Sequence, residues 1–73
     1  MYSSTYIIKC VIAQSRGRNY GIAFDAMVSG RKTFAELAPA SQNAIRQVLK
    51  DLTVVGELRF EAGKLLREHN IER

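Results

Sequence analysis

TYIIKCVIA, at residues 5–13, is the stretch that decides the predicted fold. It is dense in β-branched and aromatic residues, which crowd a helix and fit a pleated strand. We therefore expect a strand that is apolar on both faces, with Lys9 as its one charged residue. A polar loop, QSRGRN, occupies residues 14–19. Over residues 20–29 one set of alternate positions is entirely apolar, and consists of Tyr20, Ile22, Phe24, Ala26 and Val28. Because a period of two is typical of a strand, residues 5–29 are predicted to form a β-hairpin.

Three helices are expected in the rest of the chain. Thr33 stands three residues before Glu36, the reciprocal capping pattern, and predicts a short helix over residues 33–38. Ser41 can cap a second helix over residues 42–52, in which Ile45, Val48, Leu49 and Leu52 form one apolar stripe. The last helix is expected over residues 57–69.

The predicted order is therefore ββααα, an α+β fold in a single domain of 73 residues. Two alternatives stay open, a helix over residues 22–29 and a strand over residues 57–61. A two-stranded hairpin is only marginally stable by itself, and the three helices can cover one of its faces. The other face of the first strand also needs cover, which a homodimer or a third strand from Thr53 to Val55 would supply.

Charge and composition limit the partners and the compartment. Residues 1–50 hold seven basic and two acidic residues, whereas residues 51–73 hold four basic and five acidic ones, and the whole chain is +4. A basic segment of this kind favours a polyanion such as DNA, or an acidic protein surface. The apolar run from Tyr6 to Ala13 is too short for a bilayer, which needs about 20 residues, so no membrane partner is expected. A single cysteine without a secretory leader predicts a reducing, intracellular and cytoplasmic setting.

The inventory of reactive side chains predicts a protein that is not an enzyme. Cys10 stands between apolar neighbours and is typical of a small buried hydrophobe. His69 is the only histidine and no second cysteine exists, so neither a metal site nor a cofactor is expected. Glu57 and Glu61 have the one-turn spacing of an ordinary solvated helix face.

The segment from Lys32 to Leu52 carries the first candidate binding site. It contains TFAELA, a Pro-Ala-Ser turn and the amphipathic stretch SQNAIRQVLKDL. This order resembles the helix-turn-helix of winged-helix and repressor-type DNA-binding proteins, in which the second helix lies in the major groove. The resemblance implies that Arg31 and Lys32 contact phosphates and that base edges are read by the outward side chains, which are Gln42, Asn43, Arg46, Gln47 and Lys50. A solvated helix face has the same composition, and this alternative stays open.

The second candidate site is the predicted hairpin tip, where Arg16 and Arg18 flank Gly17. Two arginines on a projecting loop can reach a phosphate backbone or an acidic protein patch. The sequence therefore predicts a small, basic DNA-binding regulator. The alternative is a protein–protein interaction module, an adaptor or an inhibitor of a larger protein. It would contact its partner through the hairpin or through the leucines of the last helix, which are Leu58, Leu65 and Leu66.

Overall fold

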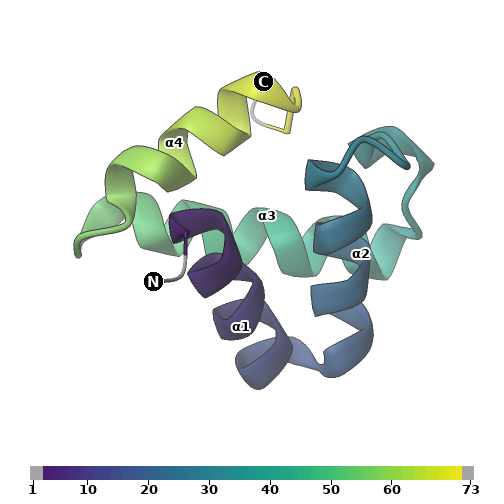
Figure 1. Ribbon diagram of the computed structural model, residues 1–73, viewed down its shortest axis with the longest axis horizontal. Coiled ribbons are helices and arrows are strands. Elements are labelled where there is room, and N and C mark those ends of the chain that lie inside the picture. The colour runs from purple at the N-terminus through teal and green to yellow at the C-terminus, as the bar shows by residue number, and fades with distance from the viewer. Residues whose placement is uncertain (1–2, 72–73) are drawn as a thin grey trace.

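The computed structural model describes residues 3–71, and all regular structure in that range is helical (Figure 1). The α-helices are α1 (Ser4–Arg16), α2 (Arg18–Val28), α3 (Pro39–Val54) and α4 (Arg59–Glu68), and the 3-10 turn η1 (Phe34–Glu36) lies between α2 and α3. No strand occurs within residues 3–71. The predicted α+β fold with an N-terminal β-hairpin is therefore wrong.

Burial explains why the predicted first strand is a helix. A β-branched residue costs a helix only about 0.7 kcal/mol or less relative to alanine. Ile8 and Ile12 stand four residues apart on one face of α1, and both are fully buried, whereas Tyr6, which would share their face in a strand, is 43% exposed. Burying such a side chain contributes about 1.5–3 kcal/mol, which outweighs the propensity of the segment. The helix begins with a capping bond, in which the Tyr6 N–H donates to Ser3 Oγ at 3.1 Å.

The second predicted strand is α2, so the helical alternative for residues 22–29 is correct as far as Val28. Gly17, with a φ of 133°, ends α1 and lets the chain turn directly into α2. The two helices then pack closely at Gly21, where an added Cβ would lie 2.9 Å from Ala13 Cβ. The glycine that was expected at a hairpin tip therefore joins two helices.

The later elements agree better with the sequence. The predicted helix over residues 33–38 is shortened to η1, whose capping box between Thr33 and Glu36 is present. α3 begins at Pro39, a favoured first helical residue, rather than after Ser41. It continues through residues 53–54, which excludes the third strand suggested there. α4 occupies most of residues 57–69, so the strand alternative for residues 57–61 is wrong.

The helices surround one apolar core. Figure 1 shows α3 crossing the α1–α2 pair, with α4 running back along α3. The largest fully buried side chains come from α1, α2 and α3, and are Ile8, Ile12, Phe24, Met27, Ile45 and Leu49. α4 adds Ala62, Leu65 and Leu66, which are also buried. The strand face that was expected to need a second copy does not exist. Within residues 3–71, none of the helices has the length and apolar character required to cross a membrane.

Candidate nucleic-acid interface

The outward side of α3 carries polar and basic side chains that lie on one stripe of the helix. Asn43, Gln47 and Lys50 are exposed and Arg46 is half-buried. Their spacing of three and four residues places them on the side opposite Ile45, which is fully buried. We call these four residues the α3 face. No acidic residue occurs from Pro39 to Lys50, so a polyanion meets no carboxylate of this segment.

One of the two predicted loop arginines lies beside the α3 face. Arg16, the last residue of α1, donates from Nη1 to Gln47 Oε1 at 2.7 Å. The bond joins residues that are 31 positions apart in the sequence, so two candidate sites that were predicted separately meet here. Arg18, the first residue of α2, is exposed and makes no hydrogen bond or ion pair with the described residues.

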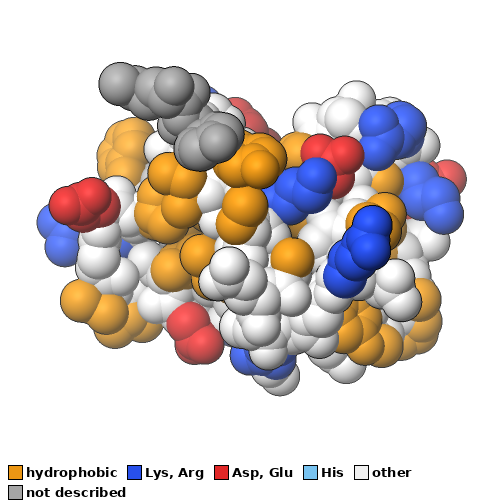
Figure 2. Space-filling view, turned by 60° about the horizontal axis from the view of Figure 1, so that its bottom comes forward, with side chains coloured by type: hydrophobic (Ala, Val, Ile, Leu, Met, Phe, Trp, Pro, Cys, Tyr) orange, Lys and Arg blue, Asp and Glu red, His pale blue; other side chains and the backbone are white. Residues whose placement is uncertain are grey.

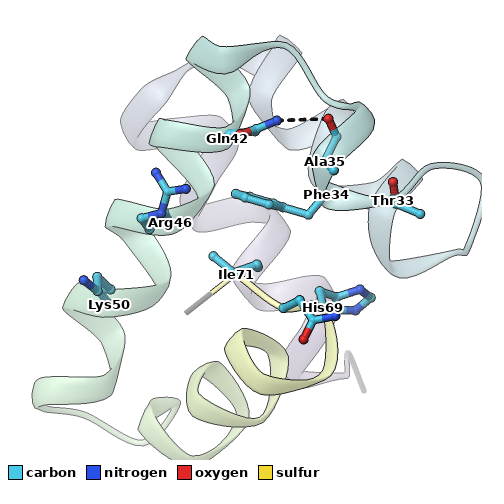
Figure 3. A pocket seen from close by; sticks show the side chains of 9 residues that line it. Thr33, Phe34, Ala35, Gln42, Arg46, Lys50, His69 and Ile71 are labelled. Carbon is cyan, nitrogen blue, oxygen red and sulfur yellow. Dashed lines mark hydrogen bonds between the residues drawn. The ribbon is translucent and has the colours of Figure 1, made fainter. Parts of the chain in front are cut away.

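Gln42 has a structural contact that the sequence did not reveal. Its Nε2 donates to the carbonyl oxygens of Ala35 at 3.2 Å and Leu37 at 2.9 Å, and the residue is half-buried (Figure 3). These bonds attach η1 to the first turns of α3. The amide hydrogens that a base edge would need are therefore already used.

The two predicted phosphate contacts ahead of η1 differ in their surroundings. Arg31 Nη2 lies 3.1 Å from Asp25 Oδ2, and Lys9 Nζ lies 3.9 Å from Asp25 Oδ1. Arg31 is thus paired with α2. Lys32 is exposed and directly precedes Thr33, which lines the cleft described next.

A cleft of about 610 Å³ adjoins the α3 face. Figure 3 shows the Phe34 ring near its centre, with Arg46 and Lys50 on the α3 side and His69 and Ile71 approaching from the end of α4. Within the described residues 3–71 the lining contains no aspartate or glutamate, and it is formed by Thr33, Phe34, Ala35, Gln42, Arg46, Lys50, His69, Asn70 and Ile71. The turn after α4 reaches the cleft because Asn70 adopts a φ of 54° and turns Ile71 inward, where it is 4% exposed.

Arg46 is held at this cleft by two neutral groups. Its guanidinium carbon lies 5.4 Å from the centroid of the Phe34 ring, and its Nη1 donates to Asn43 Oδ1 at 3.0 Å. Among residues 3–71, no carboxylate forms an ion pair with it. A cation over an aromatic face gains about 0.5–2 kcal/mol, which fixes the side chain without neutralising it.

The charge distribution of the molecule is uneven. In the view of Figure 2, Lys and Arg side chains gather in the right half with Asp and Glu side chains among them, whereas the left half is mainly hydrophobic and neutral. The absence of carboxylates holds for residues 39–50 and not for all of α3, because Asp51 follows directly.

The reactive residues considered in the sequence lie apart from one another. Cys10 is a free, half-buried thiol in α1, and His69 caps the C-terminus of α4. Within residues 3–71, no three histidine, cysteine or acidic side chains are grouped as metal ligands. Phe34 and Ile71 line the cleft, although no sequence motif identified either as part of a site. Only the capping box near Phe34 gave a signal, because it marks where the chain bends.

Comparisons with protein-family models, with curated proteins and with solved structures found no match for this chain. We therefore infer the function from the geometry of the α3 face and the cleft.

Proposed function

We propose that the protein is a small DNA-binding regulator that contacts DNA through the α3 face. The observation that carries this proposal is the stripe of Asn43, Arg46, Gln47 and Lys50 on one side of a 16-residue helix, with Arg16 bonded to it and no carboxylate from Pro39 to Lys50. This function places the protein inside the cell, where the free thiol of Cys10 stays reduced.

The chemistry of the stripe suits a DNA groove. A major groove about 12 Å wide admits an α-helix. The amide N–H groups of Asn43 and Gln47 are left to donate to adenine. Each amide oxygen accepts one bond, from Arg46 or Arg16, and keeps a second lone pair for the adenine amino group. Arg46 and Lys50 also line the cleft beside the stripe, where a phosphate would flank an inserted helix. Gln42 is left out of the reading set because its amide holds η1.

The helix-turn-helix resemblance applies only to α3, because the structure before this helix differs from the motif. The segment before α3 is a three-residue 3-10 turn, and the nearest preceding α-helix ends at Val28. Residues 29–38 connect α2 to α3, a longer link than the usual three or four residues of the motif. The proposal therefore depends on α3 as the groove helix and on no particular partner helix.

Fluorescence anisotropy with a labelled DNA duplex, repeated over a range of salt concentrations, tests the proposal. Binding should weaken with salt, with a slope of log K against log salt of about −0.9 for each phosphate neutralised. Lys50→Ala should weaken binding several-fold and reduce the slope by about one. Lys64→Ala is the matched control, since it removes the same charge from an exposed site on α4, and it should bind like the wild type. Equal effects of the two substitutions, or no salt-sensitive binding, would refute the proposal.

A second candidate function, a protein–protein interaction module, is favoured by one observation. Val54, Val55 and Phe60 around the α3–α4 turn are 76%, 71% and 81% exposed. The leucines that the sequence suggested for this contact do not serve it, because Leu65 and Leu66 are buried in the core. Exposed apolar groups of this size mark contact surfaces.

Affinity capture with the tagged wild type and with Phe60→Ser tests this second function. A partner that is retained by the wild type and lost by the variant would support it. Capture of the same proteins by both forms would contradict a role for this turn.

A further inference from the structure

The guanidinium of Arg46 is held in place without a negatively charged partner among residues 3–71. Arg46 is half-buried against Phe34, bonded to Asn43, and unpaired with any carboxylate of residues 3–71. Removing a guanidinium partly from water is unfavourable unless other groups replace the lost solvation. The Phe34 ring and one amide oxygen replace only part of it, which leaves most of the five N–H donors of the guanidinium for a ligand.

The cleft in front of Arg46 has the size and lining of an anion site. Its volume of about 610 Å³ lies within the range of roughly 300–1,000 Å³ that small-molecule sites occupy. Lys50 lines it one helical turn beyond Arg46, and Lys32 precedes its edge at Thr33. Among residues 3–71, none of the side chains that line the cleft is acidic, so an anion meets no like charge from this part of the lining.

We infer that this cleft binds a phosphate group, held by the guanidinium of Arg46 and the ammonium of Lys50. We assign this phosphate to the backbone of bound DNA, and this assignment rests on the proposed function. The planar guanidinium can present two parallel N–H groups to a phosphate, an arrangement that a lysine ammonium does not provide.

The geometry reduces the cost of binding. Ordering a long side chain at an interface costs about 0.5–1.5 kcal/mol, and the Phe34 and Asn43 contacts have already ordered Arg46 in the free protein. Phe34 itself is 8% exposed and is fixed by η1, which Gln42 attaches to α3. The cation is therefore positioned by a chain of contacts that begins in the core.

The same chemistry could come from free inorganic phosphate or from a DNA backbone, and a titration followed by NMR separates the two. Sodium phosphate is added to the ¹⁵N-labelled protein at constant ionic strength, with sodium chloride in the reference sample. The Arg46 Nε–Hε signal and the backbone amides of Phe34 and Ile71 should shift and saturate. The same signals should shift with a DNA duplex, at lower concentration.

Two substitutions examine the geometry. Arg46→Lys keeps the charge but loses the paired donors and the stacking, so phosphate affinity should fall about tenfold. Lys50→Gln should also weaken binding, and it keeps the test informative if changing Arg46 disturbs the fold. Arg67→Gln, at an exposed arginine on α4, is the control and should bind phosphate like the wild type.

The outcomes distinguish this inference from the proposed function. Saturable phosphate shifts without DNA binding would leave an anion site for free phosphate and overturn both the assignment to DNA and the proposed function. DNA binding that is weakened by Lys50→Ala but unaffected by Arg46→Lys, with no saturable phosphate shift, would overturn the cleft site alone. Shifts of equal size in the sodium chloride sample would also overturn it, because they would report a general effect of salt.

Discussion

The close packing of α1 against α2 leads to a prediction in which one type of substitution has opposite effects at two glycines. Gly21 and Gly63 both lie inside helices, where alanine is favoured over glycine by about 1 kcal/mol. Their surroundings differ. A Cβ at Gly21 would lie 2.9 Å from Ala13 Cβ and 3.4 Å from the Lys9 carbonyl oxygen. A Cβ at Gly63 would meet only Arg67 Nη1 at 3.5 Å, the end of a flexible side chain.

These distances set the expected magnitudes. Overpacking a helix contact costs about 1–3 kcal/mol, and the propensity gain of about 1 kcal/mol offsets part of it. Gly21→Ala should therefore lower the free energy of unfolding by about 1 kcal/mol, taking the middle of that range. Gly63→Ala should raise it by about 0.5–1 kcal/mol. In a domain of this size each kcal/mol changes the Tm by about 4–8 °C.

Thermal and urea unfolding followed by circular dichroism measure both variants. A double variant with Ala13→Gly and Gly21→Ala removes the methyl group that the new Cβ would strike, and Ala13→Gly alone completes the set of four proteins. The two changes should therefore show an interaction energy of at least about 0.5 kcal/mol in a double-mutant cycle. Stabilisation by Gly21→Ala equal to that by Gly63→Ala would refute the α1–α2 packing described above.

Two further predictions concern η1. The Thr33 N–H donates to Glu36 Oε1 at 2.7 Å, and this bond lowers the pKa of Glu36 below its usual 4.5. A lowered pKa stabilises the fold above the unfolded value and loses that effect as the pH falls through the folded value. Glu36→Gln should therefore reduce the Tm near neutral pH. The difference from the wild type should shrink as the pH falls below about 4.5 and vanish below the folded pKa. A constant difference in Tm across this range would contradict the cap. Gln42→Ala removes the bonds to Ala35 and Leu37 and should cost about 1–3 kcal/mol in urea unfolding, and no change would show that η1 does not depend on it.

The sequence predicted the second half of the fold well because one period dominated it. Ile45, Val48 and Leu49 follow a helical spacing, and all three are buried in α3. The capping box of Thr33 and Glu36 is local and is confirmed. The first half failed because β-propensity and helical spacing disagreed there. Residues 5–13 are apolar on both faces of a strand, and such a continuous apolar run fits a buried strand and a buried helix alike.

The site was predictable only as far as it depends on a single helix. Asn43, Gln47 and Lys50 were expected to point outward, and the structure places all three on the exposed side of α3. The bond from Arg16 to Gln47 and the approach of Ile71 to the cleft depend on how the helices pack. The residue pattern of a single helix does not predict contacts of this kind. The role of Gln42 was likewise not predictable, because its bonds to the Ala35 and Leu37 carbonyls form only when η1 packs against α3.

The most direct test of the central claim is a map of amide shifts when ¹⁵N-labelled protein is titrated with a DNA duplex. If DNA binds to the α3 face, the largest shifts should fall on the side-chain amides of Asn43 and Gln47 and on their neighbours in α3. Shifts centred on Val55 and Phe60 at the α3–α4 turn, or no saturable shift at low salt, would contradict it.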